Sequence, residues 1–254
     1  MAFDWPYFWH QLFVPSGMFL QGLWLTFSLA VAGQAMGMLL GLPLALARRA
    51  RARALSWPAR LYIHLMRGTP LLVQIIFIYT GLAAANILRF QDWTIGFLTI
   101  PGNVQAGILA LGLNEAAYMA EIFRAGIDAV DIGQTEAAKS LGMRPILVLR
   151  YVVLPQAIRI VLLPIGNQFN LMLKNTTLVS VIGVSEMLLV TETINSATFR
   201  TFELFSVVAI YFLILTTAWG VVMGWIERRM SQSDASPARP GVAALAKIAP
   251  EVAT

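Results

Sequence analysis

Long apolar runs separated by short charged stretches dominate this chain. A membrane-spanning helix needs about 20 predominantly apolar residues, and five segments of roughly that length are present. They cover residues 22–47, 61–88, 104–127, 157–174 and 204–226. The first is followed by four closely spaced arginines, and the last by an acidic and two basic residues. The pattern predicts an all-α integral membrane protein with five transmembrane helices.

Composition agrees with this prediction and excludes other classes of protein. Of the 254 residues, 58% are hydrophobic and 12% are charged, whereas a soluble domain carries about 25% charged residues. A soluble enzyme and a disordered chain are therefore excluded as descriptions of the whole sequence. The chain has no cysteine, which excludes disulfides, thiolate catalysis and cysteine-ligated metal sites.

The basic residues gather on one side of the predicted membrane. With five crossings, the loops after the first and third spans lie on the same side as the C-terminus. Most lysines and arginines are there, namely Arg48, Arg49, Arg51, Arg53, Arg60, Lys139, Arg144, Arg150, Arg228 and Arg229. Because basic loops stay in the cytoplasm, we expect the N-terminus outside and the C-terminus inside. These loops account for the net charge of +5, so no nucleic-acid partner is expected.

The two ends differ in composition from the middle of the chain. Residues 1–19 contain many aromatic residues and no lysine or arginine, which is typical of an interfacial segment and not of a cleavable signal peptide. Residues 230–254 are rich in serine, alanine and proline and are predicted to form a flexible cytoplasmic tail. The transmembrane domain is expected to occupy residues 20–229.

The connector of residues 133–156 is long for a loop between two helices. Helix-forming residues precede Gly142, and Pro145 suits the first turn of a second helix. A cytoplasmic helix–Gly–helix unit with apolar side chains is costly unless it packs on another surface. Two explanations stay open on this ground, docking on a partner protein and packing beneath the chain's own helices.

This connector resembles the cytoplasmic loop of permease subunits of ATP-binding-cassette (ABC) importers. That motif has Glu-Ala-Ala, a glycine after three residues, an isoleucine after nine more, and Leu-Pro after one more. Val152 stands at the isoleucine position, and six residues match: Glu136, Ala137, Ala138, Gly142, Leu154 and Pro155. The resemblance covers residues 20–229. It points to the polar amino-acid branch (histidine, glutamine, glutamate, arginine or opines) through residues 67–74, 117–124, 154–157 and 174–178.

The resemblance implies a type I importer permease in the inner (plasma) membrane of a bacterial cell. Such a permease forms the translocation path by alternating access, and the six matching residues would couple it to the ATPase. The implied partners are a cytoplasmic ABC ATPase dimer, a second permease subunit of the same or a related chain, an external solute-binding protein and membrane lipid. The chain has no phosphate-binding Gly-x-x-x-x-Gly-Lys-Ser/Thr loop. We therefore expect that the chain is not an enzyme and binds no cofactor. ATP would be used by the partner ATPase.

Polar residues inside the predicted spans are the candidates for the translocation path, because ionisable groups in a membrane are costly and typically functional. In the third span they share about a third of the helix circumference, and in the fourth they follow i, i+3, i+7 spacing. They are Glu115, Tyr118, Glu121, Asn167, Asn170 and Lys174. A zwitterionic amino acid needs such charged and hydrogen-bonding partners. The alternative is that these residues join helices or form an intramembrane ion pair.

Other patterns indicate structural roles. Arg124, Asp128 and Asp131 follow i, i+4, i+7 spacing and are expected to pair. Three glycines at four-residue spacing allow close helix approach in the first span, namely Gly33, Gly37 and Gly41. The two histidines belong to no metal-binding or catalytic pattern.

Three alternatives to an amino-acid importer differ from it in features that the sequence displays. An ion-coupled secondary transporter would use Glu115 and Glu121 as a relay, but no inverted repeat relates the two halves, and the apolar cytoplasmic loop would have no use. A non-transporting membrane scaffold would lack the polar path. An importer of the same class for another solute is disfavoured only by the resemblance. The identity of the amino acid, and the choice between homodimer and heterodimer, stay open.

Overall fold

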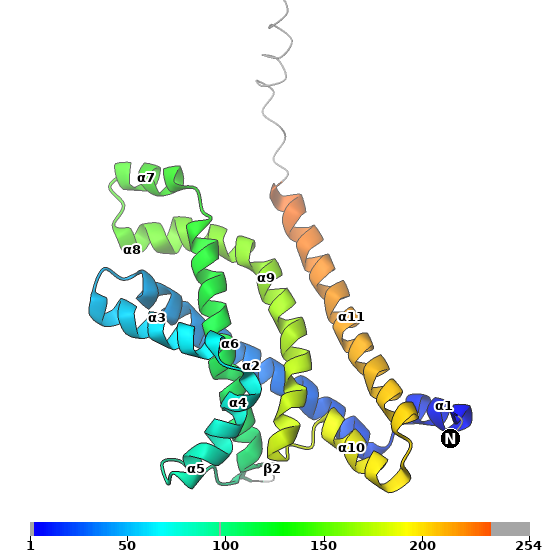
Figure 1. Ribbon diagram of the computed structural model, residues 1–254. Helices are drawn as coiled ribbons and strands as arrows, with labels where there is room; N and C mark the ends of the chain where they lie inside the picture. The colour runs from blue at the N-terminus through cyan, green and yellow to red at the C-terminus, as the bar shows by residue number, and fades with distance from the viewer. Residues whose placement is uncertain (1–2, 97, 235–254) are drawn as a thin grey trace, which may run out of the picture.

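The computed structural model describes residues 3–96 and 98–234. It is mostly helical, and Figure 1 shows its helices spread between two ends of the molecule. In chain order the elements are α1 (Trp5–Phe13), α2 (Gly17–Arg49), α3 (Arg53–Gly68), α4 (Leu71–Ile76), η1 (Phe77–Gly81), α5 (Leu82–Ala84), β1 (Trp93–Ile95), β2 (Leu98–Ile100), α6 (Gly102–Asp128), α7 (Ile132–Ser140), α8 (Pro145–Val148), η2 (Leu149–Val153), α9 (Leu154–Asn175), η3 (Thr176–Ile182), α10 (Met187–Thr198) and α11 (Thr201–Asp234).

Three stretches of helix in the described part are long and apolar enough to cross a membrane. They are Gly17–Arg49, Pro145–Ile182 and Thr201–Met230. These helices contain the expected spans at 22–47, 157–174 and 204–226. The last helix continues to Asp234, a few residues into the expected tail, and residues 235–254 of that tail lie outside the described residues.

The expected span at residues 61–88 is not one continuous helix, which corrects the sequence prediction. Two helical segments, Arg53–Gly68 and Leu71–Ala84, pass the membrane test together but are bent by 108°. The break lies at Thr69, which is extended at φ −117° and ψ 146°. Proline disfavours the helical conformation in the residue before it, so Pro70 ends the first segment. The pair is a broken span or a re-entrant segment.

The expected span at 104–127 corresponds to α6, which is not among the three apolar helices. Its 27 residues extend over roughly 40 Å, enough to cross a bilayer. Many of its residues are buried, and it packs against α2, α3, α4 and α9. A helix enclosed by other helices tolerates polar side chains that a lipid-facing helix does not. This explains how α6 carries several charged residues.

The glycines of α2 lie where that helix contacts α6. A Cβ atom added at Gly37 would be 2.4 Å from Cγ of Glu115, and one added at Gly41 would be 2.5 Å from Cβ of Met119. Gly33 meets Leu111 and Met172 in the same way. The packing role expected for these three glycines is therefore present in the structure.

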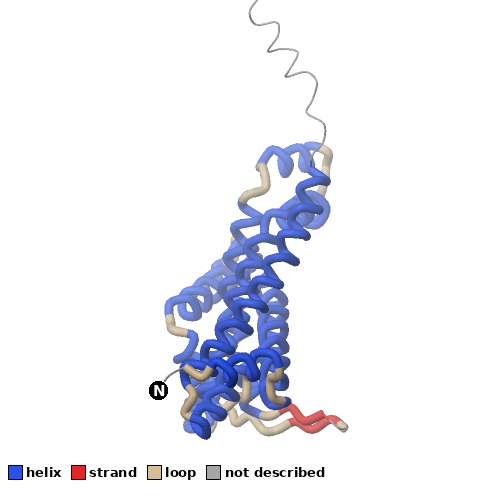
Figure 2. The backbone as a smooth tube through the Cα atoms, turned by 90° about the vertical axis from the view of Figure 1, so that its right-hand side faces the viewer, coloured by secondary structure: helices blue, strands red, loops and turns tan. Residues whose placement is uncertain are grey.

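A short hairpin departs from the expected all-α fold. Strands β1 and β2 pair antiparallel, with Trp93 opposite Ile100. In Figure 2 the hairpin projects from the lower end of the molecule, while the helices form the body above it. The carboxylate of Asp92 accepts a hydrogen bond of 2.8 Å from the first N–H of α6, at Gly102. This bond fixes the hairpin to the start of the central helix.

The N-terminal helix α1 packs against α11. Asp4 caps α1 by accepting a hydrogen bond of 3.0 Å from the N–H of Tyr7 and forms an ion pair with Arg200. The N–H of Asp4 donates a bond of 2.8 Å to Glu203. The hydrogen bond from Arg200 holds the pKa of Asp4 below its usual range. This network ties the start of the chain to the start of the last helix.

Candidate functional site

The connector at residues 133–156 folds into α7, a glycine turn, and α8. Gly142 has a left-handed backbone with φ +78°, a conformation that glycine adopts at little cost. Its N–H donates 2.9 Å to the carbonyl of Lys139, and the N–H of Met143 donates 3.2 Å to that of Ala138. These bonds end α7 in a tight reversal, and the chain then enters α8 at Pro145.

The connector has an inner and an outer surface. Ala138 is buried and packs with Ile127, Val148, Val153 and Ala157 beneath the helices. Glu136 and Ala137 are exposed. The outward-facing apolar residues are Ile132, 73% exposed, Leu141, 83% exposed, and Ile146, 64% exposed. The sequence left two explanations open, and the structure is compatible with both. The inner surface packs on the chain's own helices, and the outer surface has no partner among the described residues.

Leu154 and Pro155 begin α9, directly after the π-helical turn η2. Leu154 is half-buried and Pro155 is exposed. A π-helical turn followed by a proline is a place where a helix bends readily. The two residues therefore lie at the junction of the connector with the long helix.

A polar cavity of about 450 Å³ lies between the bend at residues 69–70 and α6 and α9. Asn114 lines it and donates bonds of 3.1 Å to the carbonyl of Met66 and 3.0 Å to Oε1 of Gln74. Gln74 in turn donates 2.7 Å to the hydroxyl of Thr69. This network satisfies groups that the helix break leaves free and holds one wall of the cavity. The lining residues are Arg67, Gly68, Thr69, Pro70, Leu71, Asn114, Tyr118, Gln168, Leu171 and Asn175.

The six residues that the sequence predicts for the translocation path do not lie together in the structure. Tyr118 lines this cavity. Glu115 is buried between helices, and its Oε2 accepts a bond of 3.2 Å from Gln168. Asn167 and Lys174 are exposed on another side of α9, and Asn170 is half-buried there. Glu115 and the three α9 residues are not among the cavity-lining residues of the described structure.

Gln168, Leu171 and Asn175 line the cavity in place of the expected α9 residues. They follow the same i, i+3, i+7 spacing, shifted by one position from Asn167, Asn170 and Lys174. The spacing is visible in the sequence, but packing decides which side of the helix faces the cavity. Arg67 and Asn114 were missed as lining residues for the same reason. Their signal was the helix break at Pro70.

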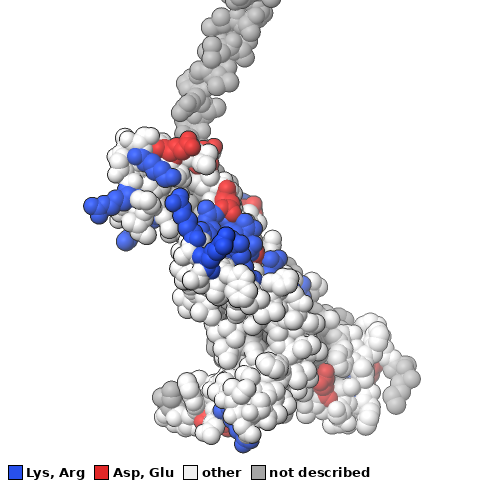
Figure 3. Space-filling view, turned by 60° about the vertical axis from the view of Figure 1, so that its left-hand side comes forward, with Lys and Arg blue, Asp and Glu red and all other residues white. Residues whose placement is uncertain are grey.

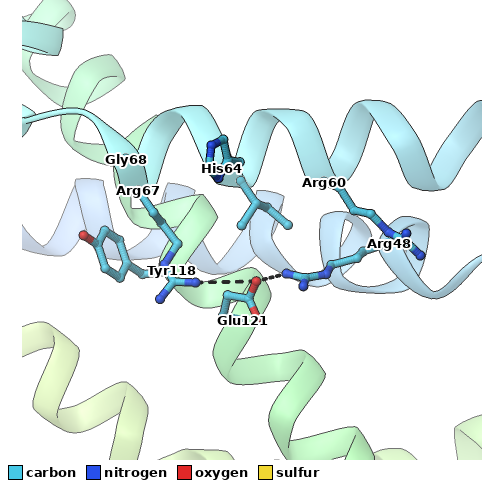
Figure 4. Close-up of a pocket in the computed structure, with 8 residues that line it drawn as sticks. Arg48, Arg60, His64, Arg67, Gly68, Tyr118 and Glu121 are labelled. Carbon is cyan, nitrogen blue, oxygen red and sulfur yellow. Dashed lines mark ion pairs between the residues drawn. The ribbon is translucent and has the colours of Figure 1, made fainter.

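Glu121 is the centre of an ion-pair network at one end of α6. It contacts Arg48, Arg67 at 3.5 Å and Arg124 at 3.0 Å. Figure 4 shows Arg48 of α2 and Arg67 of α3 reaching the Glu121 carboxylate from two sides. Glu121 therefore joins three helices. A single carboxylate shared among three guanidinium groups leaves an excess of positive charge.

The pairing expected of Arg124, Asp128 and Asp131 holds only in part. Arg124 pairs with Asp128 at 2.8 Å, and Arg49 also contacts Asp128. Asp131 instead accepts a bond of 2.7 Å from the N–H of Gly133 and caps α7. The helix α6 ends at Asp128, so Asp131 no longer continues its i, i+7 face.

Within residues 3–96 and 98–234, no group of three histidine, aspartate or glutamate side chains could hold a metal ion. The polar groups described above are amides, a phenol and ion pairs. Amide and phenol groups can exchange hydrogen bonds with a polar solute.

Residues 37–232 match the family described as "Binding-protein-dependent transport system inner membrane component". The chain is 34% identical over 231 residues to the glutamine transport system permease protein GlnP of Escherichia coli (strain K12), covering 91% of this chain and 99% of the relative. It is 39% identical over 248 residues to the octopine transport system permease protein OccM of Rhizobium radiobacter, covering 93% and 96%. It is 32% identical over 225 residues to the histidine/lysine/arginine/ornithine transport system permease protein HisM of Salmonella typhimurium, covering 89% and 95%.

Solved structures share the fold. A crystal structure of an amino acid ABC transporter with histidines aligns with a TM-score of 0.79 and 38% identity, over 90% of this chain and all of that one. An inward-facing structure of the methionine ABC transporter MetNI aligns with a TM-score of 0.68 over 89% and 98%, at 15% identity. The second likeness concerns the fold alone.

Proposed function

Because this chain belongs to the family of binding-protein-dependent transport system inner membrane components, we propose that it is the permease subunit of an ATP-driven amino-acid importer. One observation carries the proposal, the match along about nine-tenths of the chain to permease proteins of amino-acid and opine transport systems. The chain is a membrane-spanning transport subunit and not an enzyme, since ATP hydrolysis in such importers belongs to a separate subunit. An ion-coupled transporter is not favoured.

The same membership supports three kinds of partner: ATPase subunits, a solute-binding protein and a second permease subunit. We propose that the bundle crosses the membrane five times, counting the bent pair α3–α5 and the central helix α6. The domain occupies residues 20–229, preceded by an interfacial segment (1–19) and followed by a cytoplasmic tail (230–254). The N-terminus is outside and the end carrying α7 and α8 is cytoplasmic, because the basic residues gather there.

The cavity beside Tyr118 is our candidate for one part of the translocation path. Arg67 offers a cation to an α-carboxylate, and the amides of Asn114, Gln168 and Asn175 offer hydrogen bonds. Buried Glu115, which accepts a hydrogen bond from Gln168, adds a carboxylate beside this set, and Glu121 contacts Arg67 at 3.5 Å. An amphoteric solute finds complementary groups there.

A second part of the path is proposed along the exposed side of α9. Asn167 and Lys174 are exposed on a helix that is long and apolar enough to span a membrane. Polar groups facing lipid are costly, so such residues face protein or a water-filled space. This supports a path between two permease subunits, with Asn167, Asn170 and Lys174 facing the second one.

The outer surface of α7 and α8 is proposed as the contact with the ATPase. It has exposed apolar side chains, and the connector continues directly into α9 at Leu154 and Pro155. A surface of this kind at the cytoplasmic end gains free energy by burial on a partner. A push on α7 would reach α9 through the buried contacts of Ala138.

Purification of the tagged chain from its native membrane in mild detergent tests the proposal. We expect an ATPase with a phosphate-binding loop to co-purify at about one copy per permease chain, and the reconstituted complex to take up radiolabelled polar amino acids only with ATP. Uptake driven by an ion gradient without ATP would contradict the proposal. So would failure to recover an ATPase after cross-linking through a cysteine introduced at Met143.

Substitutions at the cavity test the path. Gln168→Ala removes a lining amide that also bonds Glu115, and we expect weaker solute affinity and slower uptake. Gln91→Ala is the matched control, because Gln91 is an exposed residue outside the bundle. Glu115→Gln and Asn170→Ala complete the series. Unchanged affinity and selectivity in all three test variants, at equal membrane levels, would reject these residues as part of the path.

A further inference from the structure

The helix α3 has three distinct sides. Ser56, Ala59 and Ile63 are buried, at positions that pack against α2 and α6. At 100° per residue, the basic residues Arg53, Arg60, His64 and Arg67 follow one another along an adjacent side. The remaining side is apolar and exposed, with Trp57 at 65%, Leu61 at 41% and Leu65 at 52% exposure.

The basic side of α3 borders a cavity of about 580 Å³. Figure 4 shows Arg60, His64 and Arg67 along α3, with Arg48 approaching from α2. The one carboxylate lining this cavity is that of Glu121, which already contacts Arg48, Arg67 and Arg124. Within the described residues, Arg60 has neither an ion pair nor a hydrogen bond. The cavity therefore has an uncompensated positive charge.

The exposed apolar side distinguishes this site from an ordinary basic surface. A helix with a basic side next to an apolar side of Trp and Leu lies at a membrane interface, with its apolar side in the acyl boundary. Figure 3 shows that most lysines and arginines on this face gather toward the upper end, above a middle part almost free of charge. The basic cavity and the apolar side thus meet at one depth of the proposed membrane.

We propose that the cavity formed by Arg48, Arg60, His64 and Arg67 binds the phosphate of an anionic phospholipid. Guanidinium groups match phosphate oxygens in bidentate geometry. The acyl chains would extend along Trp57, Leu61 and Leu65, which a free phosphate ion would leave uncovered. The site shares Arg67 with the candidate solute cavity, but Arg48, Arg60 and His64 do not line that cavity, and no step of the proposed transport requires a lipid here.

Native mass spectrometry of the intact complex, with the full chain and its partner subunits, tests this proposal. Phosphatidylglycerol and phosphatidylcholine with identical acyl chains are titrated against wild type and Arg60→Gln. We expect phosphatidylglycerol to bind more tightly than phosphatidylcholine. One basic residue near an anionic lipid accounts for about a fivefold change in affinity, so Arg60→Gln should weaken phosphatidylglycerol binding about fivefold. Arg60→Lys should restore most of it.

Arg51→Gln is the matched control, because Arg51 is an exposed arginine in the turn before α3 and does not line the cavity. Equal weakening by Arg51→Gln and Arg60→Gln would overturn the proposal and indicate general charge attraction. Equal binding of both lipids would overturn it too. Displacement of the lipid by millimolar inorganic phosphate would assign the site to a free anion instead. ATP-driven uptake by Arg60→Gln in neutral-lipid vesicles separates failure of this site from failure of the proposed function.

Discussion

The close contact between α2 and α6 depends on glycines of α2, which have no side chain. Gly37 lies so close to the Cβ and Cγ atoms of Glu115 that a Cβ atom at position 37 would overlap them. Those atoms are close to the backbone of α6, so they cannot move aside without moving the helix. The glycine spacing seen in the sequence therefore determines how closely the buried side chain of Glu115 approaches α2.

Gly37→Ala should destabilise the protein. The added Cβ would be 2.4 Å from Cγ of Glu115, and overpacking of this kind costs about 1–3 kcal/mol. Gly220→Ala on α11 is the control, since a Cβ there meets nothing within 4 Å and helix propensity favours alanine by about 1 kcal/mol. Thermal unfolding in detergent should show a lower Tm for Gly37→Ala and an unchanged or higher Tm for Gly220→Ala. A common response of both variants would contradict this packing argument.

Glu186 lies outside the long apolar helices and is fully buried. Its carboxylate accepts bonds of 2.8 and 2.9 Å from the N–H groups of Leu188 and Leu189 at the start of α10. Burial nevertheless raises the pKa of Glu186 from its ordinary value of 4.5 to about 7. The folded protein therefore binds this proton more tightly than the unfolded chain does.

This shift predicts a stability that falls with rising pH. The contribution of Glu186 is fully present below pH 4.5 and is lost as the pH rises through about 7. We expect a lower Tm at pH 8 than at pH 5 and a smaller difference in Glu186→Gln. Glu227→Gln, at an exposed carboxylate of α11 that does not act on Glu186, should keep the wild-type difference. An unchanged pH dependence in Glu186→Gln would show that another group is responsible.

At the scale of whole elements, hydropathy predicted the three long apolar helices and missed the shape of the segment that bends. The apolar runs of α2, α9 and α11 are long enough to be recognised from composition. The break at Thr69–Pro70 is local and visible in the sequence as a proline. The hydrogen bonds that Asn114 donates to Met66 and Gln74 across this break join residues far apart in the sequence. The choice between Gln168 and Asn170 as a cavity residue likewise depends on the rotation of α9 in the bundle.

The turn between α7 and α8 has a backbone that only a few residues tolerate. Gly142→Val should reduce uptake strongly, because a β-branched residue at φ +78° is strained by about 1–2 kcal/mol or more. Gly142→Asn is the matched control, since asparagine adopts left-handed conformations more readily and nothing lies within 4 Å of the added Cβ. We expect ATP-driven uptake to fall more in the valine variant, with equal membrane levels. Full uptake by Gly142→Val would show that transport does not depend on the backbone geometry of this turn.

Across the whole molecule, the end that contains α7 and α8 differs in charge and in composition from the end that contains the β1–β2 hairpin. Figure 1 shows α7 and α8 at one end and α10 with the hairpin at the other. An odd number of crossings, which the three apolar helices, the bent pair and α6 would make, places the two termini on opposite sides of the bilayer. By the positive-inside rule, we expect the basic end in the cytoplasm. Neither the charge pattern nor the bundle geometry determines the orientation without the other.

Single cysteines test this orientation directly, because the natural chain has none. Ser140 on α7 and Ser196 on α10 are a matched pair, since both are exposed and both donate a side-chain hydrogen bond to the carbonyl four residues earlier. In intact spheroplasts, a membrane-impermeant maleimide should label Ser196→Cys. Ser140→Cys should react only after the membrane is opened, and in urea-treated membranes if a bound ATPase covers it. Labelling of Ser140→Cys from outside would reverse the orientation, and labelling of both from outside would require an even number of crossings between α7 and α10.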